Sequence, residues 1–282
     1  MIPSAFDYTR PATVDEAVAA LASAGEDAKV LGGGQSLLPV LRLRMAAPSM
    51  LVDLAGIEEL VGVRLEDDAL VIGAMTTHAA VLRDQLVRRY APLVAAATGK
   101  VGDRQVRHLG TFGGSIAHAD PAADLPAVAL ALDAEMVVAG PGGRRTLPAA
   151  EFFVDYLTTA IGADEVLVEV RIPTLEGWSA HYEKFCRVAQ AWAIVGVAVA
   201  VRRDNGTISG ARVALANMAS TPIRASAVES ALIGQPANEE TYRTAAARAV
   251  EGTRAGADLG ASAEYREHLA GVLTRHALAA VS

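Results

Sequence analysis

The chain is poor in cysteine. Cys186 is the single cysteine among 282 residues. A disulfide bond within the chain is therefore excluded, and so is an iron–sulfur cluster held by four of its own cysteines. If this protein carries out redox chemistry, its redox group is an organic cofactor, and any metal cluster belongs to another chain. We interpret Cys186 itself as a buried, small apolar residue.

A basic surplus and a membrane-spanning run are also missing. The formal net charge of −7 argues against a general nucleic-acid binder, because such a protein needs a basic face. The longest apolar stretch, Ala191 to Val201, is too short to cross a bilayer. The first residues, Met1 to Ser4, lack the basic and apolar regions of a secretion signal. These absences predict a cytoplasmic protein that is not an integral membrane protein.

Glycine, in contrast, is concentrated in two segments. One is Gly32 to Leu37 (GGGQSL), and the other is Thr111 to Ile116 (TFGGSI), which leads into Asp120-Pro121 and Asp124. Glycine lets a ligand approach the backbone closely, and successive N–H groups in a concave turn bind anions such as phosphate. One such segment alone is more typical of a tight turn. Two of them favour a clamp on the diphosphate of a dinucleotide.

Neither segment has the pattern of a Rossmann dinucleotide site. That pattern is G-x-G-x-x-G between a strand and a helix. After Gly32 to Gly34 the chain is rich in leucine and is interrupted by Pro39, with no third glycine at the required spacing. The order from Gly110 to Gly114 also misses the pattern. A bound nucleotide would therefore lie between two separate loops.

The first part of the chain is expected to be mixed α/β. Thr13 and Glu16 form a capping box for a helix that Gly25 ends. A short buried strand over 28–31 would run into the first glycine segment, and a second strand would follow at 50–54. We expect a strand at 70–73, a helix from Asp120-Pro121 to Leu132, a hairpin over 135–147 with its turn at 140–143, and a half-buried strand over 166–172.

A change of composition near 173–177 predicts a domain boundary. Beyond it we expect an antiparallel meander and then an alanine-rich helical region. The strands are expected at 181–187, 193–201 and 209–217, with a tight turn at Asp204 to Gly206, and the helices at 225–232, 238–252 and 262–279.

The chain resembles the FAD-binding medium subunits of the molybdenum hydroxylases, of the aerobic carbon monoxide dehydrogenase type. The segments that carry the resemblance are 32–39, 72–77 and 107–124, together with Lys184 and 192–194, and the similarity extends over essentially the whole chain. It implies an α+β fold. Residues 1–175 would form an FAD-binding domain of the vanillyl-alcohol-oxidase type, with subdomains of about 1–55 and 56–175. Residues 176–282 would form a C-terminal domain of three antiparallel strands and a helix bundle.

The resemblance implies a set of cofactor-binding residues, and neither a catalytic residue nor a metal ligand on this chain. The N–H groups of residues 33–36 and the Ser36 hydroxyl would hold one part of the diphosphate, and residues 113–115 the other. Thr111 would bond near the flavin or its ribityl chain. The full set is Gly32, Gly33, Gly34, Gln35, Ser36, Leu37, Thr76, Thr111, Gly113, Gly114, Ser115, Asp124, Leu167, Lys184 and Trp192.

Four of these residues have an ordinary structural interpretation beside the implied one. Asp124 would accept hydrogen bonds from ribose hydroxyls, or would complement the dipole of a helix in its first turn. Lys184 would reach the flavin ring and favour its reduced anionic form, or would be a solvated surface lysine. The Leu167 backbone would touch the flavin, or its side chain would only fill a core strand. Trp192 would cover one flavin face, or would be a core tryptophan.

Histidines and a basic cluster require separate interpretation. Some flavoproteins of the implied fold attach FAD through histidine, but the family that this chain resembles binds FAD non-covalently. We therefore interpret His78 as a helix-start residue and His118 as a loop residue near the diphosphate. Arg104, Arg107 and His108 would form a docking surface for an iron–sulfur partner, or simply a solvated face.

The function implied is electron transfer inside a larger oxidoreductase. A large partner subunit would hold the molybdenum cofactor, and a small one would hold 2Fe–2S clusters. The medium subunit would take electrons from those clusters through non-covalent FAD and pass them to a quinone or another external acceptor. The resemblance further implies a dimer of heterotrimers and an association with the inner face of the membrane through partners.

Two other functions are considered. The first is a self-contained flavoenzyme of the same fold, a reductase or a small oxidase, which needs a proton donor or base beside the flavin. Glu183, Tyr182 and Ser220 are the candidates for that role, and none stands in a recognisable motif. The second is a nucleotide-binding or scaffold protein without redox activity.

Overall fold

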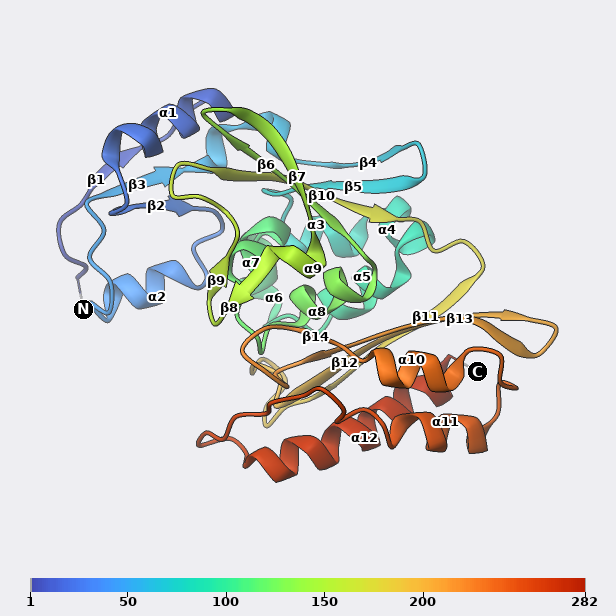
Figure 1. Cartoon of the computed structure of the whole chain (residues 1–282). Coiled ribbons are helices and arrows are strands. Elements are labelled where there is room, and N and C mark those ends of the chain that lie inside the picture. The colour runs from blue at the N-terminus through green and yellow to red at the C-terminus, as the bar shows by residue number, and fades with distance from the viewer. Residues whose placement is uncertain (1, 282) are drawn as a thin grey trace.

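The computed structural model of the protein describes residues 2–281 and shows a mixed α/β fold in two lobes (Figure 1). The helices are α1 (Val14–Ala24), α2 (Leu37–Arg42), α3 (His78–Arg83), α4 (Gln85–Tyr90), α5 (Pro92–Thr98), α6 (Arg104–Leu109), α7 (Phe112–His118), α8 (Asp124–Ala131), α9 (Ala149–Phe152), α10 (Ser226–Leu232), α11 (Glu239–Ala246) and α12 (Ala263–Ala280). No helix among the described residues is both long and apolar enough to cross a membrane.

A small parallel sheet begins the fold. Its strands are β1 (Asp7–Thr9), β2 (Ala28–Leu31) and β3 (Met50–Asp53), in the order β1-β3-β2. The expected capping box is present, since Thr13 Oγ1 accepts from Glu16 N at 3.2 Å and Gly25 ends α1 with φ +77°. The expectation that β2 is buried is wrong beyond Ala28, because β2 is an edge strand of this sheet.

A larger antiparallel sheet follows, with most of the short helices packed beside it. Its order is β4-β5-β10-β6-β7, with β4 (Val63–Glu66), β5 (Ala69–Gly73), β6 (Glu135–Gly140), β7 (Gly143–Pro148) and β10 (Val166–Pro173). The hairpin predicted over 135–147 is confirmed by the pairing of β6 with β7.

Two details of this lobe differ from the sequence prediction. The helix predicted from Asp120 begins only at Asp124, because the Asp120 carboxylate accepts from Ala122 N at 2.8 Å and closes a turn there. A separate two-stranded hairpin, β8 (Phe153–Asp155) with β9 (Thr158–Thr159), was not expected.

The second lobe is built on a four-stranded antiparallel sheet rather than a three-stranded one. Its order is β11-β12-β13-β14, with β11 (Trp178–Phe185), β12 (Val195–Asp204), β13 (Thr207–Ala216) and β14 (Ile223–Arg224). The fourth strand has only two residues, too few to show a periodic pattern. The predicted turn is confirmed at Asn205 and Gly206, where φ is +50° and +79°.

Alternation along β12 explains how this sheet is covered on both faces. Val195, Val197, Val199 and Val201 pack into the core shared with α10, α11 and α12. The residues between them are small, and Ala198 and Ala200 belong to the core of the first lobe. Side chains alternate between the faces of a strand, so one face is bulky and the other allows close approach.

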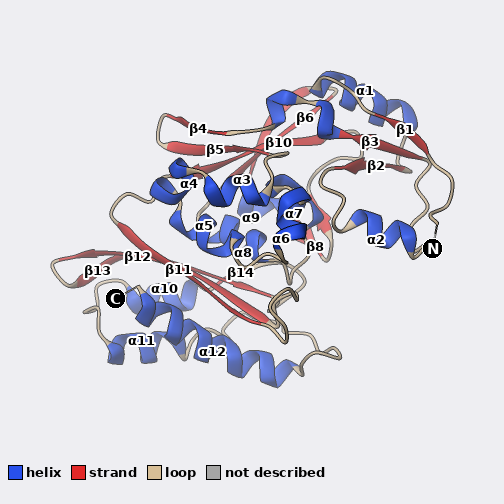
Figure 2. Cartoon of the chain, turned by 180° about the vertical axis from the view of Figure 1, so that it is seen from behind, coloured by secondary structure: helices blue, strands red, loops and turns tan. Residues whose placement is uncertain are grey.

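The small face of the sheet is covered by α5 and α8 (Figure 2). Every residue of α8 is buried, as expected for a helix enclosed on all sides. The core of the first lobe therefore continues into the second, and residues from Leu70 on β5 to Ala216 on β13 belong to one cluster. The N-terminus of α8 lies at the junction of the two lobes, which positions Asp124 there.

Candidate cofactor site

The first glycine segment forms a concave turn between β2 and α2. Gly34 has φ +72°, and its carbonyl accepts from Leu38 N at 3.0 Å. The Gln35 side chain closes the turn by donating from Nε2 to Gly33 O at 3.1 Å. Within the described residues, the N–H groups of residues 33–36 have no hydrogen-bond acceptor. The Ser36 hydroxyl also makes no bond there, so this turn has free donors for an anion.

The second glycine segment is the first turn of α7 rather than an open loop. Thr111 caps the helix, its Oγ1 accepting from Gly114 N at 3.1 Å and its carbonyl from Ser115 N at 3.1 Å. Gly113 N donates to Ala74 O at 2.9 Å. These three N–H groups are therefore engaged within the chain. What this segment presents outwards is the exposed backbone of Gly114 and the half-buried side chain of Ser115.

The two segments lie against each other although Gly34 and Thr111 are 77 positions apart in the sequence. A Cβ atom on Gly33 would be 2.2 Å from Leu109 O, and one on Gly32 would be 3.2 Å from Thr111 Oγ1. Only glycine permits the first of these approaches, because the neighbour is a backbone oxygen that cannot rotate away. The first turn, with its free N–H groups, thus packs against the residues that lead into α7, and the residues present fit a diphosphate bound at this junction.

Thr76 supports the second segment instead of presenting its side chain. Its hydroxyl donates to Gly62 O at 3.0 Å and accepts from Gly62 N at 2.9 Å, and the residue is 2% exposed. Its carbonyl accepts from Phe112 N at 2.9 Å. The Thr76 hydroxyl is therefore fully used within the protein, and its contribution to the site is to hold the start of α7.

Asp124 and Lys184 form a buried ion pair between the lobes. Lys184 Nζ donates to Asp124 Oδ2 at 2.9 Å and to Lys100 O at 3.1 Å, and the two side chains are 2% and 3% exposed. The interpretation of Lys184 as a solvated surface residue is wrong. Asp124 is the first residue of α8, where a negative charge is favoured by the helix dipole.

Tyr182 completes this cluster and was not among the cofactor-binding residues expected from the sequence. Its hydroxyl donates to Asp124 Oδ1 at 2.7 Å. Burial raises the pKa of Asp124, while the Lys184 ammonium and the Tyr182 hydroxyl lower it. Burial, followed by the charge of Asp124, raises the pKa of Tyr182 well above its ordinary value. The signal in the sequence was the spacing of Tyr182 and Lys184, two apart on one strand and hence on one face.

Trp192 lies in the connection between β11 and β12, and its side chain is exposed. It is 52% exposed, so the alternative of a core tryptophan is wrong. The backbone beside it is held in place, since Ala193 N donates to Ala122 O at 3.2 Å and Asn217 Nδ2 donates to Ala193 O at 2.7 Å. This connection therefore lies against the turn that precedes α8.

Leu167 is buried in β10, beside an irregularity in its pairing with β6. The residue is 5% exposed, and the register shifts between Leu167 and Glu169. Val168 O instead accepts from Ala74 N at 2.9 Å, and Ala74 in turn accepts from Gly113 N. The backbone around Leu167 is thus connected to the second glycine segment through a single residue.

His78, at the start of α3, and Arg107, in the last turn of α6, are engaged in the fold. His78 begins α3, as expected, is 3% exposed, and has no partner for Nδ1 within the described residues. Burial, followed by the charge of the nearby Arg107 guanidinium, lowers its pKa to about 4. Arg107 itself donates to Val101 O at 2.8 Å and to Gly102 O at 3.2 Å. Arg104 and His108 have no such bonds among the described residues.

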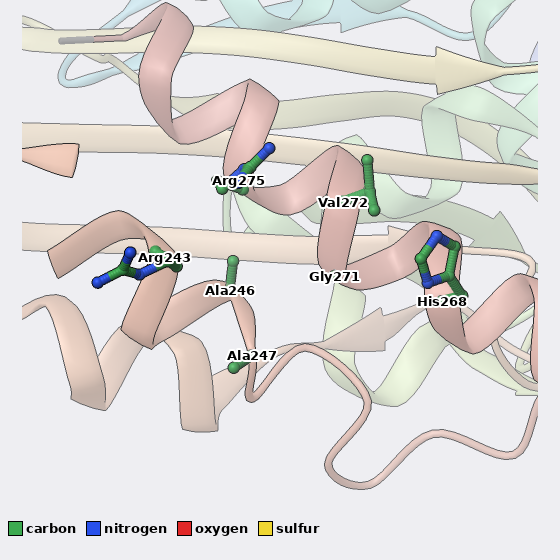
Figure 3. Close-up of a pocket in the computed structure, with 7 residues that line it drawn as sticks. All are labelled: Arg243, Ala246, Ala247, His268, Gly271, Val272 and Arg275. Atoms are coloured by element: carbon green, nitrogen blue, oxygen red, sulfur yellow. The ribbon is translucent and has the colours of Figure 1, made fainter. Parts of the chain in front are cut away.

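A shallow hollow of about 300 Å³ lies elsewhere, between α11 and α12 (Figure 3). It is lined by small residues such as Ala246 and Gly271, with Arg243, His268 and Arg275 around them. Both helices pack on the valine face of the second sheet, opposite α8. This hollow is therefore not part of the site at the glycine segments.

Two family models together match nearly the whole chain. Residues 4–175 match the model described as the FAD binding domain in molybdopterin dehydrogenase. The chain belongs to this family of FAD-binding proteins. Residues 180–281 match a second model, described as the CO dehydrogenase flavoprotein C-terminal domain. Both glycine segments, Asp124 and Leu167 lie within the first match, and Lys184 and Trp192 lie within the second.

Full-length relatives of this flavoprotein family are also similar. The carbon monoxide dehydrogenase medium chain of Hydrogenophaga pseudoflava is 42% identical over 99% of this chain and 97% of its own length. The caffeine dehydrogenase subunit beta of a Pseudomonas species is 38% identical over 99% of this chain and 95% of its own. A solved structure of the Hydrogenophaga pseudoflava carbon monoxide dehydrogenase matches with a TM-score of 0.97 and 43% identity, over 100% of this chain and 98% of that one.

Proposed function

We propose that this chain is the FAD-carrying electron-transfer subunit of a molybdenum hydroxylase of the carbon monoxide dehydrogenase type. The observation that carries the proposal is the row of free N–H groups at residues 33–36, in a turn that packs against the residues leading into α7. A diphosphate is the ligand suited to such a row, because each N–H can donate to a phosphate oxygen without a metal ion. The relatives named above are the second support.

The residues around this row would each bind a part of FAD. The N–H groups of residues 33–36 and the Ser36 hydroxyl would hold the diphosphate, with Gly114 allowing close approach and Ser115 adding a hydroxyl. Asp124 and Lys184 would lie at the ribose or flavin end, and Trp192 would cover a flavin face. The Leu167 backbone would line the same side. Non-covalent FAD supplies one- and two-electron redox chemistry that these side chains lack.

The domain organisation is part of the proposal. Residues 1–175 would form an FAD-binding domain of the vanillyl-alcohol-oxidase type, with subdomains at about 1–55 and 56–175, and residues 176–282 the C-terminal domain. The diphosphate would then lie between the β2–α2 turn of the first subdomain and α7 of the second. The buried Asp124–Lys184 pair would connect the second subdomain to the C-terminal domain.

The partners follow from the type of enzyme. A small subunit with 2Fe–2S clusters would deliver electrons to this chain, and a large subunit with the molybdenum cofactor would oxidise the substrate. The external acceptor would be a quinone or another electron acceptor, and the complex a dimer of heterotrimers. Carbon monoxide is the substrate suggested by the relatives in Hydrogenophaga pseudoflava and Afipia carboxidovorans, at 42% and 37% identity.

A self-contained flavoenzyme finds less support in the side chains available. Tyr182 already donates to Asp124, and Glu183 Oε2 lies 2.8 Å from His181 Nε2. Both groups therefore already have a hydrogen-bond partner within the chain. Ser220 lies in the irregular connection after β13. The chain therefore favours electron transfer over separate substrate chemistry.

The test is the visible spectrum of the chain purified from its native host, with the co-purifying proteins identified. We expect a flavin band together with iron–sulfur absorption, and one small and one large partner. Flavin in an isolated chain that reacts rapidly with NAD(P)H or a small substrate would contradict the proposal. A colourless chain that still associates with partners would contradict it as well.

A further inference from the structure

Two donors from one strand hold one carboxylate from the other lobe. Tyr182 and Lys184 on β11 are separated by one residue, so both point to the same face of the sheet. The Tyr182 hydroxyl donates to Asp124 Oδ1 at 2.7 Å, and the Lys184 ammonium donates to Asp124 Oδ2 at 2.9 Å. Each carboxylate oxygen thus has its own donor, in a cluster with almost no exposure to solvent.

The neighbouring strand leaves space for this tyrosine. A Cβ atom on Gly196 of β12 would lie within van der Waals overlap of the Tyr182 hydroxyl oxygen and 3.2 Å from Tyr182 Cζ. Glycine inside a strand weakens it, because it has no side chain to pack and loses more conformational freedom on folding. Here the phenol of Tyr182 occupies the space that a side chain on Gly196 would fill. The glycine and the tyrosine are therefore one structural unit.

We propose that Tyr182 is a positioning residue for the flavin site, whose hydroxyl orients the Asp124 carboxylate and thereby sets where the Lys184 ammonium lies. This inference rests on the proposed function, because it assumes that FAD binds beside Asp124 and Lys184. A carboxylate with one donor can rotate and can take up a proton. Two donors of fixed direction favour its ionised form and hold it in one orientation.

The surroundings of the cluster make its protonation depend on this hydroxyl. The groups that face Asp124 or Tyr182 are Lys184 from β11, Lys100 from the α5–α6 connection and Cys186 just after β11. Burial raises the pKa of Asp124, whereas the charges of Lys184 and Lys100 lower it. Removing the Tyr182 hydroxyl would leave Oδ1 without a donor, which favours the protonated carboxyl further and moves its titration to higher pH.

The experiment compares Tyr182→Phe with Tyr242→Phe in the full chain, purified with the subunits that accompany it. Tyr242 is a matched control, because it is also 2% exposed and its hydroxyl has no partner within the described residues. The dissociation constant of added FAD is measured by fluorescence from about pH 8 down to about pH 5. We expect Tyr182→Phe to weaken FAD binding by about 10-fold or more, as for a lost hydrogen bond to a charged group, and increasingly so as the pH falls.

Tyr242→Phe is expected to match the parent protein at every pH. Gly196→Ala, whose methyl group would displace the phenol, is expected to reproduce the pH-dependent loss of FAD binding that Tyr182→Phe shows. A Tyr182→Phe protein that binds FAD as the parent does, or that loses affinity by one factor at all pH values, would overturn the inference. If the parent protein itself binds no FAD, the proposed function fails first, so the two failures are distinguishable.

Discussion

Lys184 and Asp124 neutralise each other across the junction of the two lobes, with 2.9 Å between Nζ and Oδ2 and almost no exposure to solvent. The carboxylate begins α8 in the first lobe, and the ammonium projects from β11 in the second. A buried charge is tolerated only when it is paired and hydrogen-bonded, so each lobe supplies the counter-charge for the buried charge of the other. The packing of the two lobes against each other and the charge distribution at the candidate site therefore depend on the same ion pair.

Asp124→Asn is expected to destabilise the protein strongly. It leaves the Lys184 ammonium buried without a counter-charge, which typically costs about 3–5 kcal/mol of unfolding free energy. Chemical denaturation measures this loss. The double variant Asp124→Leu with Lys184→Met should regain much of the stability while FAD content stays low. An Asp124→Asn protein as stable as Arg248→Met, which breaks only an exposed ion pair, would contradict the buried pairing.

Gly33→Ala is expected to remove FAD. The added Cβ would lie 2.2 Å from Leu109 O, so the first glycine segment could not stay against the second. Gly142→Ala is the control, because a Cβ there meets no atom within 4 Å. Flavin absorbance per protein should fall to near zero in the first variant and stay at the parent value in the second.

Gly114→Val should also abolish FAD binding, since the side chain would fill the approach to the start of α7. A Cβ at this position would already lie 2.6 Å from Thr111 Oγ1. Flavin content after gel filtration measures the effect. Undiminished flavin in this variant would mean that the diphosphate does not approach Gly114.

Trp192→Ala is expected to change the flavin and not the fold. The side chain is 52% exposed, so its loss should leave the unfolding free energy nearly unchanged. Flavin fluorescence should rise, because a tryptophan over the ring quenches it. Trp178→Ala should instead lower the unfolding free energy and leave flavin fluorescence unchanged. Arg212 and Arg202 lie 5.0 and 5.5 Å from that ring and would lose their packing. Unchanged flavin fluorescence in Trp192→Ala would exclude a contact between the Trp192 side chain and the flavin ring.

His78 is expected to make the protein sensitive to acid. Its pKa is lowered to about 4 by burial, whereas the unfolded chain titrates near the ordinary 6.5. Between these values the unfolded state binds more protons, so stability falls as the pH falls, by up to about 3 kcal/mol. Urea unfolding of His78→Gln from pH 7 to pH 4 should show a smaller loss than the parent protein. His276→Gln, which changes an exposed histidine, should retain the parent slope.

Much of the fold follows from local patterns, and the exceptions have physical reasons. The capping box at Thr13, the hairpin over 135–147 and the turn at Asn205-Gly206 depend on neighbouring residues and were predicted correctly. The start of α8 was misplaced because the Asp120 side chain closes a turn instead of capping the helix. The strand β14 was missed because two residues carry no periodicity.

The sequence by itself determined the two glycine segments, the exclusion of an iron–sulfur cluster held by four cysteines of this chain, and, through the family resemblance, the candidate residues from Gly32 to Trp192. Tertiary structure alone decided that Gly33 lies against Leu109, that Lys184 is buried against Asp124, and that Tyr182 donates a hydrogen bond to Asp124. The physical reason is the sequence separation of the interacting residues. Glycine spacing and strand alternation depend on residues a few positions apart, whereas a hydrogen bond between β11 and α8 joins residues 58 apart, and only packing of the two lobes brings them together.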